Sequence, residues 1–198
     1  MAMPHTTTPD PALVDAGARE ALCLALALLD DAQARAIPYE MTLALAAVAR
    51  SYHVLHARHS AAAAFALALR WAQASGSADQ TVDLHCEIAE TAAREMLELK
   101  RGLEADGETD PHAARAARRI ARERARDHAF EAARLAPTVT DGTWEARVLL
   151  RASEVLEQCG DRDDAMLLQS RALRLMSDES DGTSDPSLLP SLGRLADA

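Results

Sequence analysis

Three histidines in the first third of the chain are spaced three residues apart, at His53, His56 and His59. Imidazole is a common ligand for transition metals, so this run could bind a metal ion or haem. On a continuous helix the first two share one face and the last two share another, so the three do not converge. Neither a cysteine nor a carboxylate is interleaved with them. We therefore expect exposed polar positions, with His59 in a turn, and we predict no metal or other cofactor.

A second candidate is the run His85-Cys86-Glu87, which puts a thiol between two groups that could act as a base. Consecutive residues of a helix point in different directions, whereas a cysteine nucleophile needs its base and an orienting group close in space. The sequence also contains no G-x-x-x-x-G-K-[ST], G-x-G-x-x-G, G-x-S-x-G or H-E-x-x-H motif. An enzyme is the interpretation with the least support, and we predict a non-enzymatic protein.

The strongest charge feature is a group of six arginines between positions 115 and 126. Four of them follow a four-three-four spacing and form one stripe on a helix: Arg115, Arg119, Arg122 and Arg126. Such a stripe could hold a phosphate backbone or an acidic protein segment. No aromatic residue interleaves the arginines, so a base-stacking platform is missing. Acids at Glu123, Asp127, Glu131 and in the loop 104–110 favour a solvated face, and an acidic protein partner is favoured over nucleic acid.

Composition predicts an all-α protein. Hydrophobic residues make up 48% of the 198 residues but aromatics only 3%, and alanine, the best helix former, supplies much of the apolar total. The net charge of −10 works against binding to nucleic acid or to an anionic membrane. The longest apolar runs, 21–29 and 61–69, are about half the length that a membrane span requires. Widely separated cysteines without a C-x-x-C motif, and an N-terminus unlike a secretory signal, predict a cytoplasmic location.

Apolar periodicity and helix-breaking residues predict about seven helices. Asp10-Pro11 and Asp110-Pro111 are start signals, Ser60 and Thr143 are candidate caps, and Gly160 is expected in a turn between two helices. We expect helices at about 10–36, 39–57, 61–75, 78–101, 111–136, 143–158 and 162–176. The predicted organisation is a flexible N-terminal tail at 1–9, a helical repeat domain at 10–178, and an acidic, mostly disordered tail at 179–198.

Two predicted hairpins carry small and large residues at the same offsets from the turn. In the last hairpin these positions are Gly160, Asp161, Ala165, Ala172 and Leu173, and in the first they are Tyr52, Ala61, Phe65, Ala68 and Leu69. This pattern resembles the tetratricopeptide (TPR) repeat over roughly residues 40–178. The middle hairpin matches only at its closing alanines. A plain helical bundle with the same alanine periodicity is the alternative fold.

The resemblance implies a short right-handed solenoid of antiparallel helix pairs, whose concave groove binds a segment of a partner protein. By position in the repeat, the groove-facing candidates are Leu43, Ala46, Arg50 and His53 in one repeat and Arg147, Leu150, Glu154 and Glu157 in another.

We therefore predict a TPR-like interaction module whose partner is a protein or peptide of unknown identity. Such a short stack also exposes its terminal faces, so a homodimer is possible. The alternative function is a regulator that binds nucleic acid or another anion through the arginine stripe.

Overall fold

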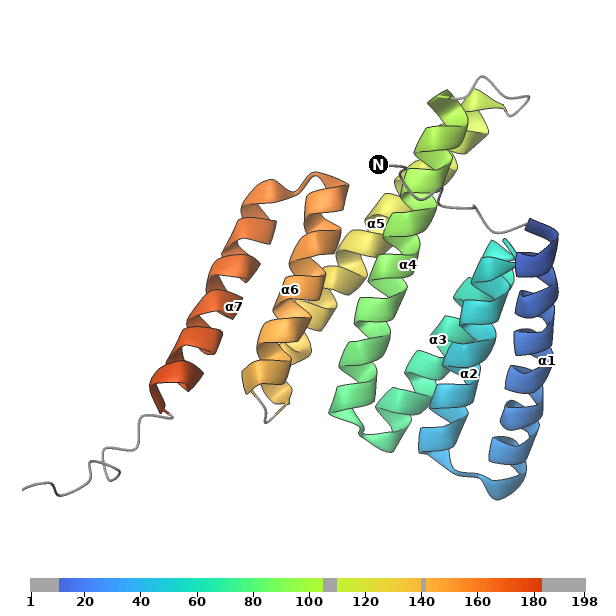
Figure 1. The fold of residues 1–198 in the computed structure, drawn as a ribbon, viewed down its shortest axis with the longest axis horizontal. Coiled ribbons are helices and arrows are strands. Elements are labelled where there is room, and N and C mark those ends of the chain that lie inside the picture. The colour runs from blue at the N-terminus through green and yellow to red at the C-terminus, as the bar shows by residue number, and fades with distance from the viewer. Residues whose placement is uncertain (1–10, 105–109, 140–141, 183–198) are drawn as a thin grey trace, which may run out of the picture.

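The computed structural model describes residues 11–104, 110–139 and 142–182, and within these ranges the protein is helical without a strand (Figure 1). The predicted all-α fold with seven helices is confirmed. The elements are α1 (Pro11–Arg35), α2 (Pro38–Val54), α3 (Arg58–Ser75), α4 (Ala78–Glu104), α5 (Pro111–Leu135), a short 3-10 turn η1 (Ala136–Thr138), α6 (Gly142–Cys159) and α7 (Arg162–Gly182).

Helices that follow one another in the chain pack as antiparallel neighbours. The most extensive contacts join α2 to α3, α4 to α5 and α6 to α7, and α1 packs against α2. Figure 1 shows the helices side by side, from α1 at one end to α7 at the other. The short turns explain this order, because Gly76 and Gly160 adopt positive φ angles of 71° and 88° and reverse the chain within two residues. The arrangement is that of a short row of helical hairpins.

The buried apolar side chains form two clusters, and α4 contributes to both. Its residues Val82, Ala89 and Ala93 pack with α5, α6 and α7, whereas Leu84 and Ile88 pack with α1, α2 and α3. The side of α5 that meets α4 is built from alanines, including Ala121, Ala125, Ala129 and Ala132. Side chains this small allow two helix axes to approach closely, which explains why this hairpin needs no large residues at its centre.

A buried carboxylate connects the two parts of the core. Glu95 of α4 forms an ion pair with Arg124 of α5, and its Oε1 atom lies 3.6 Å from Nε of Arg58 at the start of α3. Arg50 of α2 adds a second connection, because its Nη1 donates to both carboxylate oxygens of Glu87 at 2.9 and 3.0 Å. We use the term hairpin junction for the contact between the α2–α3 hairpin and α4, which includes the pairs Arg50–Glu87 and Arg58–Glu95.

Several predicted helix boundaries need correction. Helix α3 begins at Arg58 after Ala57, so Ser60 lies inside the helix and does not cap it. Thr143 is likewise the second residue of α6 and not its cap. The cap at Asp110 is confirmed, since its Oδ1 accepts from the backbone N–H of His112 at 2.9 Å. The predicted cap at Asp10 lies outside the described residues.

The C-terminal helix is longer than predicted. Helix α7 continues to Gly182, so its last turn includes residues that the sequence analysis assigned to the acidic tail. The remainder of that tail, and the N-terminal tail at 1–9, lie outside the described residues. Among the helices that the structure describes, none is long and apolar enough to cross a bilayer.

We predict that Ala165→Arg disrupts the α6–α7 hairpin. Ala165 is 2% exposed in the core, so an arginine there is both too large and an unpaired buried charge, which lowers the free energy of unfolding by about 4 kcal/mol or more. Met166, the next residue, is 64% exposed. Met166→Arg is the matched control and is expected to change stability by less than about 0.5 kcal/mol. Thermal melting followed by circular dichroism measures both; equal melting temperatures would contradict the assigned packing of α7.

Candidate functional site

A cavity of about 350 Å³ lies between α2 and the first half of α4, and we call it the groove. Leu43, Ala46 and Arg50 of α2 line one side of the groove. The other side carries Leu84 and three acids of α4, together with an arginine of α6; these charged residues are Asp79, Asp83, Glu87 and Arg151. Three of the four groove residues predicted on α2 therefore line one cavity. The fourth, His53, lines a different cavity beside α3.

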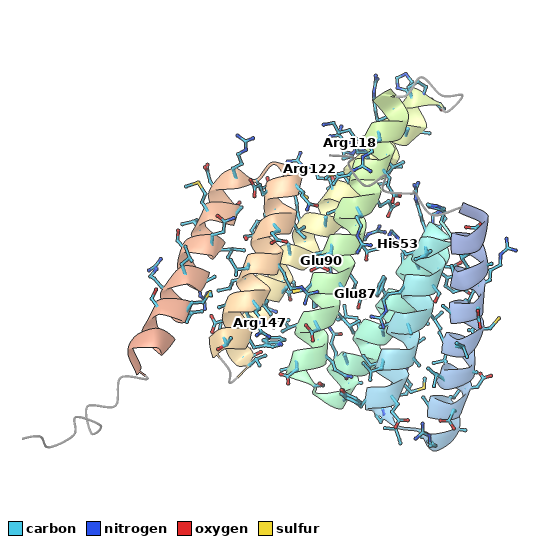
Figure 2. All side chains as sticks on the ribbon, viewed as in Figure 1. His53, Glu87, Glu90, Arg118, Arg122 and Arg147 are labelled. Atoms are coloured by element: carbon cyan, nitrogen blue, oxygen red, sulfur yellow. The ribbon has the colours of Figure 1, made fainter. Side chains whose placement is uncertain are left out.

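The four groove residues predicted on α6 do not line this cavity. Arg147, Glu154 and Glu157 are exposed, and Leu150 is partly buried against the core. Figure 2 shows Arg147 on α6 and His53 on α2, with Glu87 and Glu90 on α4 between these two helices. The α6 side chain that reaches the groove is Arg151, which the sequence analysis did not select.

Ion pairs cross between the helices that surround the groove. Arg151 Nε lies 2.6 Å from Oε1 of Glu90, and its Nη1 lies 3.2 Å from Oδ1 of Asp83. Together with Arg50–Glu87, these pairs use three acids of α4 spaced at i, i+4 and i+7, which therefore share one face. Burial raises the pKa of Asp83, although the nearby Arg151 acts in the opposite direction. The spacing of these three acids can be seen in the sequence, but the arginines that pair with them cannot be identified from it.

The run His85-Cys86-Glu87 is divided among three environments. His85 contacts α5, Cys86 is buried in the core, and Glu87 pairs with Arg50 on the groove side. Burial raises the pKa of the Cys86 thiol to about 12, so it is protonated at neutral pH and is a poor nucleophile. The expectation that these neighbours point in different directions is confirmed.

The three histidines of the 53–59 run lie on different local structures. His53 is half-buried near the end of α2, and His56 sits in the turn with a φ of 56°. His59 is exposed on the first turn of α3, so the prediction that it lies in a turn is wrong. Within the described part of the chain, no group of three or more histidine, cysteine or acidic residues could hold a metal ion.

A pair of histidines links α4 to α5. Nδ1 of His85 lies 2.9 Å from Nδ1 of His128, and the two rings are tilted by 40° with centroids 5.0 Å apart. One of these nitrogens must donate and the other accept, which requires at least one neutral ring. Burial lowers the pKa of both side chains, and for His128 burial together with the charge of His85 lowers it to about 4. The partners are 43 residues apart, so no local sequence signal could have found them.

Two of the four arginines of the stripe form ion pairs with a residue outside α5. Arg126 Nε lies 2.6 Å from Oδ2 of Asp161, and Arg122 Nη2 lies 3.6 Å from its Oδ1. Asp161 stands in the turn between α6 and α7, so these arginines fix that turn to α5. Arg119 pairs loosely with Glu123, at 4.0 Å, one turn further along its own helix. Arg115 is exposed and has no ion pair with another described residue.

Comparisons with known proteins do not assign the chain to a family. No family model matches the sequence, and no curated protein matches it. A solved structure, the crystal structure of BtubC (BKLC) from P. vanneervenii, aligns over 96% of this chain and 100% of that chain at 15% identity, with a TM-score of 0.29. A likeness this weak supports no argument about function. The class of protein is therefore defined by the observed geometry, an all-α row of helical hairpins with a charged groove.

We predict that the His85–His128 pair makes folding stability sensitive to mild acid. The pKa of each histidine is lowered by folding, so between pH 6.5 and about 4 the unfolded chain binds more protons, and the free energy of unfolding decreases as the pH falls. His128→Gln removes the titration of His128 and leaves that of His85, so its melting temperature should decrease less than that of the parent between pH 7 and 5. His112→Gln, at an exposed position of the same helix, should behave as the parent does. Parallel pH profiles for the parent and His128→Gln would contradict the assignment.

We predict that Asp161→Asn loosens the α6–α7 turn. The carboxylate interacts with two guanidinium groups, so its neutralisation should lower the free energy of unfolding by about 1–2 kcal/mol. Asp163→Asn is the matched control, because Asp163 is exposed in the next turn of helix. Hydrogen exchange of the α7 amides measures the effect. Equal exchange in the two variants would show that the ion pairs do not hold this turn.

Proposed function

We propose that this protein is a non-enzymatic, TPR-like interaction module that holds a segment of a partner protein in the groove between α2 and α4. The observation that carries the proposal is that Leu43, Ala46 and Arg50 line one cavity of about 350 Å³. These positions were selected from the repeat pattern alone, as the residues that face a ligand in such modules. A concave, partly apolar cavity with a few fixed charged groups is suited to binding side chains of a partner.

The charges of the groove favour a partner segment that combines an apolar anchor with basic residues. Arg50 and Arg151 are both paired with acids of α4, so the cations of the groove are largely neutralised. Asp79 also lines the groove and has no ion pair with another described residue. A lysine or arginine of the partner would complement it, while an aliphatic side chain would contact Leu43 and Leu84.

The alternative, a regulator that binds nucleic acid or another anion through the arginine stripe, has less support. Two of the four stripe residues, Arg122 and Arg126, already interact with Asp161. Binding of a phosphate backbone there would compete with contacts that hold the α6–α7 turn. The net charge of −10 opposes it further.

The predicted homodimer also remains a proposal. Its support is the exposed apolar surface of the terminal helix, where Met166, Leu167, Leu173 and Met176 face solvent. Exposed apolar side chains on the last helix of a stack are suited to self-association.

We predict that Leu43→Arg releases the partner. Leu43 is 47% exposed in the groove, so the variant protein should fold normally. The substitution replaces an apolar contact with the partner by a charge. The expected loss of partner affinity is about tenfold or more, as for a central interface residue. Proteins that co-purify with the tagged chain from its native host are identified and quantified for the parent and the variant.

Leu67→Arg is the matched control, because Leu67 is 46% exposed on α3 and does not line the groove. The two variants therefore carry the same change at equal exposure. A partner retained by Leu67→Arg and lost by Leu43→Arg supports the groove. Identical sets of co-purified proteins for both variants and the parent would refute it.

A further inference from the structure

A second cavity, of about 400 Å³, lies on the other side of the hairpin junction, between α3, α4 and α5. We call it the α3 cavity. Residues of α4 separate it from the groove, since Leu84 and Glu87 line the groove whereas Ile88, Thr91 and Glu95 line the α3 cavity. Neither the predicted function nor the ion pairs of the groove use this space. The remaining wall is an entire face of α3.

The α3 cavity is elongated and largely apolar. Its lining on α3 begins at Arg58 and ends at Gln73, a span of roughly 22 Å at 1.5 Å per residue. Between these ends the wall consists of Phe65, Leu69 and several alanines, and Ile88 of α4 lies opposite. A volume of this size spread along four turns of helix fits a linear molecule better than a compact one.

Positive charge surrounds this apolar space, although the whole chain is strongly acidic. The lining contains three arginines, Arg58, Arg70 and Arg124, and one carboxylate, that of Glu95. Arg124 is paired with that carboxylate, and Arg58 lies 3.6 and 3.8 Å from acids of α4, too far for a hydrogen bond. Arg70 is exposed and has no ion pair with any residue that the structure describes.

The two ends of the cavity therefore differ in charge. Glu95 lies at the Arg58 end, where it would repel an entering carboxylate. Arg70 is three turns further along α3, and Gln73 lies one turn beyond it on the same face. No acid lines the cavity at this end. A carboxylate there would accept charge-assisted hydrogen bonds from the Arg70 guanidinium and the Gln73 amide.

We propose that the α3 cavity binds a linear aliphatic carboxylate of the fatty-acid class. The carboxylate is held at the rim by Arg70 and Gln73, and the hydrocarbon chain lies along Leu69, Phe65 and Ile88. Burial of each methylene favours binding, whereas the guanidinium selects an anionic head group over a neutral or cationic one. The site is independent of the partner groove.

The test uses the purified full chain and titration calorimetry with decanoate below its micelle concentration. Affinity should increase about three- to fourfold for each methylene added from octanoate to decanoate. Arg70→Gln should weaken decanoate binding by about tenfold while leaving decanol unchanged, because it removes the charge and not the apolar wall. Arg118→Gln, at an exposed arginine outside the cavity, should bind as the parent does. Equal affinity for decyltrimethylammonium, or no effect of Arg70→Gln, would overturn the proposal.

A second pair of variants locates the hydrocarbon chain. Ala66→Phe fills the α3 cavity from an exposed position and should abolish decanoate binding. Ala63→Phe makes the same change on an exposed part of α3 that does not line the cavity, and should have no effect. Circular dichroism checks that each variant folds. If Ala66→Phe does not fold, the effect of Arg70→Gln and the dependence of affinity on chain length test the proposed site instead. Undiminished binding by folded Ala66→Phe would overturn the proposed site. Leu43→Arg should leave decanoate binding unchanged, which separates this proposal from that of the partner groove.

Discussion

The arrangement of the hairpins depends on one buried carboxylate, that of Glu95. A charge removed from water is costly unless it is paired, so Glu95 requires Arg124 of α5 beside it and favours Arg58 of α3 nearby. Together with Arg58, this carboxylate favours contact between the first turn of α3 and the second half of α4, to which Leu84 and Ile88 add apolar packing. Because α2 precedes α3 by a short turn, contacts of α3 with α4 also favour the placement of α2 beside the groove, where Arg50 pairs with Glu87.

Helix α4 contacts four neighbouring helices, and its faces differ in chemistry. Small apolar residues such as Ala89 and Ala93 meet the alanines of α5, while Asp83, Glu87 and Glu90 pair with arginines of α2 and α6. A third face turns toward α3 and the cavity beside it. Alanine permits near approach within the hairpin, whereas long guanidinium side chains span the wider gaps from α4 to α2 and α6.

Local signals predicted the helices well, because helix formation and termination depend on nearby residues. Alanine periodicity, Pro38 and Gly160 identify segments and turns without knowledge of the fold. The contacts that build the site are non-local: Arg50 and Glu87 are 37 residues apart, and nothing in either neighbourhood identifies the other. The repeat pattern selected three residues of α2 that line one cavity, Leu43, Ala46 and Arg50. It did not select Arg151, because the rotation of α6 relative to α4 is set by tertiary ion pairs.

Contacts within the hairpins and contacts between them differ in how strongly salt affects them. The hairpins are held mainly by buried apolar packing, which salt affects little. The hairpin junction combines apolar packing by Leu84 and Ile88 with ion pairs of Arg50 and Arg58, which are partly exposed and are weakened by salt. Salt therefore weakens the ionic part of the junction and leaves its apolar part in place. The groove and the α3 cavity both lie beside this junction and are lined by different residues of α4, so a substitution that changes the lining of one leaves the lining of the other in place.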